Sequence, residues 1–173
     1  MSPDSLEIFL NPGEYAFGSA PARIRTILGS CVAVTFWHPG LRLGAMCHYL
    51  LPSRGANVDE PGGKYAEDVI PLISRHFADM GLLPAAFQVK IFGGSSMFPG
   101  LSLGENLNIG AKNIQVGLAV LTRSGFNILN YDLAGGTNRT VVFDLDSGEV
   151  WVRQGQVPQA AGRERRASSR EAG

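Results

Sequence analysis

The sequence predicts one domain of the α/β class, with two amphipathic helices and several short strands. A chain of 173 residues with 45% apolar residues is long enough to bury about two-thirds of its unfolded surface in one core. Apolar residues recur at three- and four-residue steps in two stretches, as in helices, and alternate or cluster in short runs elsewhere, as in strands. The charged fraction of 17% and the net charge of +0 give no indication of a nucleic-acid partner.

The first third of the chain is predicted to form strands. Short apolar runs at 6–10 and 14–17 flank the turn signal Asn11-Pro12-Gly13. Two longer apolar strands follow, over about 24–37 and 41–51. A tight turn at His38-Pro39-Gly40 joins them, because the proline fixes φ and the glycine supplies a positive φ. This hairpin predicts that position 31 lies roughly opposite position 47 or 48.

The remainder alternates helices and strands. The apolar spacing predicts a helix over 65–80 that bends at Pro71, since proline removes a helix hydrogen bond and clashes with the preceding turn. A second helix is predicted over 108–123, with Asn108 as its N-cap. Further strands are expected at 87–92, 128–131, 140–144 and 150–153.

The composition changes at Gln154, after which little can be buried. We therefore expect a folded domain over 1–153 and a disordered, arginine-containing tail over 154–173. The N-terminus has no basic region, and no run approaches the ~18 apolar residues of a membrane span. Two cysteines without repeated spacing indicate neither a disulfide framework nor a zinc site. These features predict a cytoplasmic protein with reduced thiols, no metal and no membrane insertion.

Cys31 and His48 are the candidate reactive pair. A histidine beside a cysteine can take the thiol proton, and the thiolate is the nucleophile. Gly29-Ser30 directly precede the cysteine, and a glycine inside a strand often marks a bulge or the approach of a ligand. Cys47 alternates with His48, so its side chain points to the opposite face. The same pattern also describes a small buried thiol beside a core histidine, and the residues alone leave both interpretations open.

A glycine-rich segment, Gly93-Gly94-Ser95-Ser96, ends the strand predicted at 87–92. Successive backbone N–H groups in such a segment can face an anion or an oxyanion. An ordinary loop with a tight turn has the same composition. The spacing fits neither a Walker loop nor a dinucleotide fingerprint, which argues against nucleotide binding.

Several blocks of the sequence resemble the CheD family, the chemoreceptor glutamine deamidases of bacterial chemotaxis. The blocks follow the family's order and span nearly everything except the tail. They are Gly13-Glu14-Tyr15, Leu28-Gly29-Ser30-Cys31-Val32-Ala33-Val34, His48-Tyr49-Leu50-Leu51-Pro52, Gly63-Lys64-Tyr65-Ala66, Lys90 to Phe98, Asn108 to Asn113 and Gly135 to Arg139. The resemblance implies a layered α/β fold, a mixed β-sandwich flanked by helices, similar to the cytotoxic necrotizing factor deamidases.

The resemblance also implies the site residues. Cys31 takes the place of the family's nucleophile and His48 that of its histidine. The family's threonine, counted without gaps, falls on Arg25, with Thr26 one residue later. Because a shift of one residue on a strand reverses the face, Thr26 can serve only if the interruption at 29–30 absorbs the shift. Backbone N–H groups would hold the oxyanion, with two sets of candidates: Gly29, Ser30 and Cys31, or Gly93, Gly94 and Ser95.

The implied reaction is hydrolysis of a receptor glutamine side chain to glutamate through a thioester, without a cofactor, which tunes chemotactic adaptation. The implied partners are the cytoplasmic domains of methyl-accepting chemotaxis receptors and, further, the CheC phosphatase. A binding protein that regulates receptors or CheC without chemistry is the alternative. A thiol redox sensor would need a resolving partner, and Cys47 on the opposite face is badly placed to be one.

Overall fold

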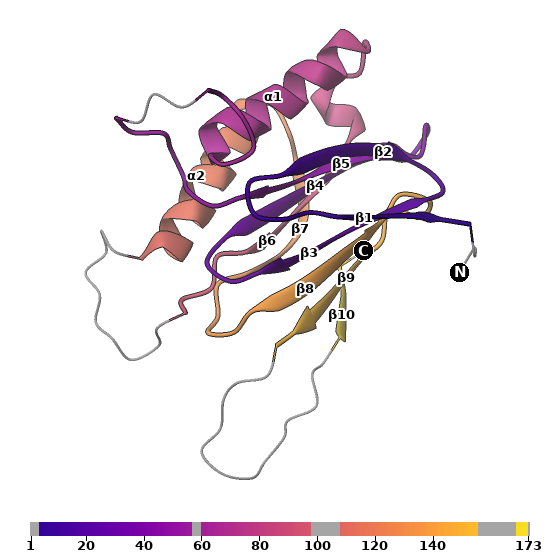
Figure 1. Ribbon diagram of the computed structural model, residues 1–173. Coiled ribbons are helices and arrows are strands. Elements are labelled where there is room, and N and C mark those ends of the chain that lie inside the picture. Colours follow the sequence, from indigo (N-terminus) through magenta and orange to yellow (C-terminus); the bar gives the residue numbers. More distant parts are fainter. Residues whose placement is uncertain (1–3, 57–59, 98–107, 156–168, 173) are drawn as a thin grey trace.

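The computed structural model describes residues 4–56, 60–97, 108–155 and 169–172, the last four by their backbone alone. Two five-stranded sheets pack face to face, and two helices lie against the outer side of one of them (Figure 1). This three-layered arrangement confirms the expected α/β class and the mixed β-sandwich. Within the described residues, the helices cover one side of the sandwich.

The first sheet combines strands from both ends of the chain, in the order β1-β3-β8-β9-β10. Its strands are β1 (Leu6–Phe9), β3 (Ala22–Leu28), β8 (Arg139–Asp144), β9 (Val150–Gln154) and β10 (Ser169–Ala172). The pair β1–β3 is parallel and the other pairs are antiparallel. β3, which ends three residues before Cys31, therefore lies inside this sheet rather than at its edge.

The second sheet has the order β2-β5-β4-β6-β7. Its strands are β2 (Tyr15–Ser19), β5 (Leu43–Tyr49), β4 (Val32–His38), β6 (Gln88–Gly93) and β7 (Ile128–Leu133). The pair β6–β7 is parallel and the others are antiparallel, so both sheets are mixed. β4 is the central strand, and it places the residues after Cys31 between His48 on β5 and the glycines at the end of β6.

Two helices, α1 (Ala66–Asp79) and α2 (Ile109–Arg123), confirm the predicted helices to within a residue or two. Asn108 caps α2, since its side chain accepts a hydrogen bond from the amide of Ala111. α1 continues past Pro71 without interruption. A short 3-10 turn, Pro84–Ala86, leads into β6. Of the helices in the described residues, none has the length and apolar character needed to cross a membrane.

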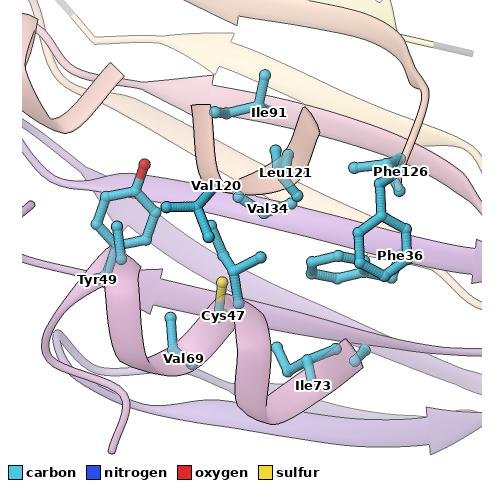
Figure 2. Close-up of a cluster of buried hydrophobic side chains, with 14 of the residues drawn as sticks. Val34, Phe36, Cys47, Tyr49, Val69, Ile73, Ile91, Val120, Leu121 and Phe126 are labelled. Atoms are coloured by element: carbon cyan, nitrogen blue, oxygen red, sulfur yellow. The ribbon is translucent and has the colours of Figure 1, made fainter. Parts of the chain in front are cut away.

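Apolar side chains fill two separate layers. One cluster lies between the sheets and includes Ile24, Leu28, Ala33 and Phe143. The other lies between the second sheet and the helices, where Val34, Phe36, Cys47 and Tyr49 face residues of α1 and α2 such as Val69 and Leu121 (Figure 2). The first five residues of β4 are buried because apolar layers cover both of its faces, which explains its unbroken apolar run.

The single strand expected over 24–37 is wrong. The structure divides it into β3 and β4, which belong to different sheets. The three residues Gly29, Ser30 and Cys31 connect the two layers of the sandwich. The physical reason is that glycine and serine permit the sharp change of direction, while the apolar patterns on either side continue undisturbed. Cys31 thus lies at a crossing between sheets.

The expected register of the hairpin is also wrong. β4 pairs with β5 so that Ala33 lies opposite His48 and Val34 opposite Cys47. Cys31 lies two residues before Ala33, outside the ladder. Continued by one residue, this register would place Cys31 opposite Leu50 rather than opposite Cys47 or His48. The turn between the strands is longer than expected, since β4 ends at His38 and β5 begins at Leu43.

The C-terminal range differs in part from the expected disordered tail. Gln154 belongs to β9, and the backbone of 169–172 forms β10, antiparallel to β9. Ladder hydrogen bonds need no apolar side chain, so a composition that predicts no core does not exclude a strand. The range 156–168 lies outside the described residues.

Candidate active site

Cys31 lies in the connection between the sheets, and hydrogen bonds to backbone carbonyls hold this connection. The amide of Gly94 donates to the carbonyl of Cys31 at 2.8 Å, and the amide of Ser95 donates to the carbonyl of Gly29 at 3.0 Å. The Cys31 thiol is free and half-buried. Burial raises its pKa above the ordinary value, although its own backbone amide acts in the opposite direction. The thiol is therefore protonated near neutral pH and needs a base to become a nucleophile.

His48 is buried near the end of β5, with 1% of its surface exposed. Its Nδ1 lies 2.7 Å from the hydroxyl oxygen of Thr26 on β3. The same hydroxyl donates its single proton to the carbonyl of Leu10 at 2.7 Å. Because a carbonyl cannot supply a proton, the Thr26 oxygen must accept the hydrogen of Nδ1–H. The lone pair of the imidazole is therefore on Nε2.

His48 Nε2 is buried and has no hydrogen-bond partner among the described residues. Burial lowers the pKa of His48 from 6.5 to about 4, and the negative charge of Glu14 opposes this shift. The imidazole is thus neutral near pH 7. A neutral imidazole with a free lone pair, oriented through its other nitrogen, can act as a general base.

The structure places Cys31 and His48 on the same side of the second sheet. Cys31 packs against the cluster between the sheets, and this cluster contains Ala33, the residue opposite His48. No hydrogen bond joins the thiol to Nε2 in the described residues. The thiol and Nε2 share this side of the sheet without a hydrogen bond between them, as is common in catalytic sites without substrate.

Cys47 points away from this site, as predicted. It is fully buried in the cluster between the second sheet and the helices (Figure 2). Burial raises the pKa of its thiol to about 12, so it remains a neutral, inert thiol. The opposite orientation of Cys47 and His48 follows from the alternation of side chains along β5.

The two expected sets of oxyanion donors differ. The amides of Gly94 and Ser95 already donate to the carbonyls of Cys31 and Gly29, so they are not available to an oxyanion. Gly93 has a φ of 108°, and a Cβ there would lie 2.3 Å from the Cys31 carbonyl oxygen. This segment therefore supports the Cys31 backbone, and its expected role as an oxyanion donor is wrong for Gly94 and Ser95. The amide of Cys31, in contrast, has no backbone acceptor among the described residues.

A buried ion-pair network holds the supporting segment in turn. Arg139, 2% exposed, donates to the side chain of Ser95 and to that of Asp132 at 2.8 and 3.1 Å. The Ser95 hydroxyl donates to the carbonyl of Thr137 at 2.6 Å. Ser95 is consequently a structural residue beneath Cys31.

Sequence reasoning assigned no role to Asn113, which the structure places beside the Cys31 segment. It is fully buried on α2, and its side chain donates to the carbonyls of Ser30 and Leu50. A signal was present in the sequence, because Gly110, Asn113 and Gly117 recur at helical spacing on the inner face. A polar residue on such a face must find internal partners. Among the described residues, no group of three or more His, Cys, Asp or Glu side chains could hold a metal ion.

Comparison with known proteins identifies similar sequences over most of the chain. Residues 50–154 match the model of the family described as CheD chemotactic sensory transduction. Two relatives named probable chemoreceptor glutamine deamidase CheD come from Pseudomonas syringae pv. syringae (42% identity over 148 residues, 85% of this chain and 84% of the relative) and Albidiferax ferrireducens (41% over 151 residues, 86% and 87%). A relative from Leptospira interrogans is 38% identical over 163 residues, 89% of this chain and 96% of its own length.

The match to the family model begins two residues after His48, so it does not test the roles of Thr26, Cys31 and His48. Among solved structures, the hypothetical protein YfiH of Bacillus licheniformis aligns with a TM-score of 0.40 and 14% identity, over 68% of this chain and 49% of that one.

Proposed function

Because this chain belongs to the CheD family of chemotactic sensory transduction proteins, we propose that it deamidates chemoreceptors, converting specific glutamine side chains to glutamate and releasing ammonia. The observation that best supports this reaction is the arrangement of His48. Thr26 accepts a hydrogen bond from Nδ1 and thereby leaves the lone pair on Nε2, on the side of the sheet that also carries Cys31.

In the proposed mechanism, His48 Nε2 takes the proton of the Cys31 thiol as the sulfur attacks the amide carbon of the glutamine. The carbon–nitrogen bond of the resulting tetrahedral intermediate breaks, and the imidazolium returns the proton to the departing ammonia. A thioester remains. His48 then takes a proton from water, whose oxygen attacks the thioester carbon, and the thiol leaves with that proton. The product is a glutamate side chain, and no cofactor takes part.

We assign the stabilisation of the oxyanion to the backbone amide of Cys31, both in the tetrahedral intermediate that precedes the thioester and in the one that follows attack by water. This amide has no backbone acceptor among the described residues, and it moves with the nucleophile itself. One such donor typically stabilises the transition state by about 3–4 kcal/mol. The amides of Gly94 and Ser95 contribute indirectly, because they donate to the carbonyls of Cys31 and Gly29 and so fix the backbone on both sides of the Cys31 amide.

The proposed substrates are the cytoplasmic domains of methyl-accepting chemotaxis receptors, which also implies a cytoplasmic location and a role in tuning adaptation. A further proposed partner, the CheC phosphatase, rests on the family resemblance alone. Binding of a purified CheC protein, measured by calorimetry, would test it.

The reaction is tested by intact-mass analysis of a receptor cytoplasmic fragment incubated with the protein. Each conversion of glutamine to glutamate raises the mass of the fragment, and fragmentation locates the residue. We expect Cys31→Ala to abolish the conversion and Cys47→Ala to retain most of it, because the Cys47 thiol lies in the other apolar layer. Equal losses in the two variants, with both folded, would exclude Cys31 as the nucleophile.

A further inference from the structure

The connection that carries Cys31 is held through three consecutive carbonyl oxygens. Backbone amides of Gly94 and Ser95 hold two of them, those of Cys31 and Gly29. The third, of Ser30, accepts a hydrogen bond of 3.0 Å from the side-chain nitrogen of Asn113. Cys31 lies outside any strand, so these bonds take the place of a sheet ladder in fixing its position. One of them depends on a side chain and can be removed by a single substitution.

The same side-chain nitrogen holds the segment that carries the base. Asn113 Nδ2 donates a second hydrogen bond, of 2.8 Å, to the carbonyl of Leu50. Leu50 lies two residues after His48, just beyond the end of β5. Both protons of one amide group thus join the two segments whose separation sets the distance from the Cys31 thiol to His48 Nε2.

The orientation of the amide follows from its partners. Ser30 and Leu50 both present carbonyl oxygens, which only accept, so the nitrogen of Asn113 must face them. The side-chain oxygen is consequently buried without a hydrogen-bond partner among the described residues. A buried acceptor without a partner destabilises the folded state, because it loses its hydrogen bonds to water. An apolar residue would serve ordinary helix packing without this cost, so the packing of α2 alone does not account for an amide here.

Other contacts hold α2 in place near this position. The Tyr49 hydroxyl donates to the backbone carbonyl of Asn113 at 2.7 Å. Tyr49 also packs against Gly117, where a Cβ would lie 2.1 Å from the hydroxyl oxygen. The helix therefore keeps an anchor on β5 when the side chain of Asn113 is changed, and the effect of the side chain can be separated from that of the helix.

We propose that Asn113 is a positioning residue for the deamidation, which fixes the Cys31 segment relative to His48 so that the thiol proton can pass to Nε2. The inference rests on the proposed function. Proton transfer between nucleophile and base requires the two groups within hydrogen-bond reach, and a misplacement of about 1 Å can reduce the rate about 100-fold. The Asn113 side chain is fully buried and donates to two backbone carbonyls, so we expect its effect on kcat rather than on substrate affinity.

The decisive variant is Asn113→Asp, which keeps the shape and replaces the donating nitrogen by an accepting oxygen. We expect kcat to fall about 10- to 100-fold, with KM within about threefold of the unchanged protein. The activity of this variant should rise again as the pH is lowered from 8 to 6, because a protonated carboxyl can donate one of the two lost bonds. The matched control is Asn108→Asp on the same helix. Among the described residues, its side chain makes one hydrogen bond, which it accepts from the amide of Ala111, so aspartate caps equally well and activity should be unchanged.

A second readout keeps the positioning role separable from the proposed function. The rate of Cys31 alkylation by iodoacetamide, followed by mass, reports on activation of the thiol without any receptor. We expect the alkylation rate to fall in both Asn113→Asp and His48→Gln, and to remain unchanged in Asn108→Asp. If the alkylation rates of the wild-type protein and the three variants follow this order but the wild-type protein converts no receptor glutamine, the proposed function fails and the positioning role stands.

Where Asn113→Asp does not fold, Asn113→Leu provides the same test without a buried charge. A folded Asn113 variant with unchanged kcat and unchanged alkylation would overturn the inference. A loss of receptor affinity alone in a folded Asn113 variant would also overturn it. So would a loss of kcat in Asn113→Asp that does not recover at low pH and leaves the alkylation rate of Cys31 normal.

Discussion

The hydroxyl of Thr26 and the backbone carbonyl of Leu10 determine which nitrogen of His48 carries the proton. The Thr26 hydroxyl has one proton and gives it to Leu10, which forces the imidazole to place its own proton on Nδ1. Burial then keeps the ring neutral near pH 7. Together with the raised pKa of the Cys31 thiol, this describes an uncharged thiol–imidazole pair in the free site. In the proposed mechanism the proton moves to Nε2 as the sulfur attacks an electrophile, whether a glutamine side chain or an alkylating reagent.

His48→Gln separates a catalyst from a binding protein. General acid–base catalysis typically contributes about 10²- to 10⁴-fold, so we expect the deamidation rate to fall by that factor while receptor affinity is largely retained. Thr26→Ala should give a smaller loss, because Thr26 orients the ring without contacting substrate. The measurement is the initial rate and the receptor affinity of each variant on one receptor fragment. Weakened affinity at an unchanged rate in His48→Gln would indicate a binding module that keeps the residues of an enzyme.

The depressed pKa of His48 makes stability depend on pH. The unfolded chain binds a proton on this histidine below pH 6.5, whereas the folded site does so only below about pH 4. The contribution of His48 to the free energy of unfolding is therefore at its maximum above pH 6.5. It decreases by about 3 kcal/mol in total as the pH falls toward 4.

Urea unfolding at pH 7 and pH 4.5 measures this effect. The difference between the two pH values should be smaller in His48→Gln than in the wild-type protein, by about 2–3 kcal/mol. The two proteins differ in this side chain alone, so the comparison reports on the histidine. Parallel behaviour of the two would show that His48 is not buried in its neutral form.

At the scale of elements, the turn that ends β6 serves as a support for the connection between the sheets. Gly94 has a φ of 70°, and a Cβ there would lie 2.5 Å from Ile114 Cδ1 and 2.9 Å from the carbonyl oxygen of Gly110. The turn is thus compressed between the Cys31 segment and the start of α2. Its glycines are required by backbone conformation and by space, which differs from the expected anion-binding role.

Gly94→Ala tests this support. The left-handed backbone costs about 1–2 kcal/mol, and the close contact with α2 adds about 1–3 kcal/mol. We expect a loss of roughly 2–4 kcal/mol of unfolding free energy together with slower alkylation of Cys31. Gly81→Ala is the matched control, since its φ of 77° is similar but nothing lies within 4 Å of its Cβ position. An equal effect of both substitutions would show that the space around Gly94 is unimportant.

At the scale of the whole molecule, β10 covers the edge of β9 and forms the outermost strand of the first sheet. β10 pairs with β9 antiparallel, from Ser169 opposite Arg153 to Ala172 opposite Val150. Sheet edges expose unpaired backbone groups, and covering them protects against association with other chains. The candidate site lies at the crossing between β3 and β4, in the interior of the sheet order, so this edge is not part of the proposed site.

Truncation after Gln154 should have little effect on stability. The four residues of β10 are Ser, Arg, Glu and Ala, which contribute hydrogen bonds but little apolar surface. We expect a loss of at most about 1 kcal/mol, or about 2–4 °C in melting temperature, and unchanged deamidation. Calorimetry of the full and truncated chains measures it, and a larger fall would show that the C-terminal residues pack on the core.

The sequence by itself was sufficient for the α/β class, for both helices and for the strands β6 to β9, whereas β10 was not expected. It also predicted the opposite orientation of Cys47 and His48. These are local properties, because the period of apolar residues and the N-cap at Asn108 depend on a few neighbours along the chain. The family blocks directed attention to Cys31, His48 and Thr26.

Only the tertiary structure decided how those residues meet. The apolar run over 24–37 looks continuous, since a strand inside one sheet and a strand that changes sheets have the same alternation. The change of sheet at Gly29-Ser30 places Thr26 across the sandwich from His48, which no count along the sequence can show. In the same way, the partners of Asn113 come from segments 83 and 63 residues away. Local patterns carry no information on such contacts, because they are set by how the layers pack and not by spacing along the chain.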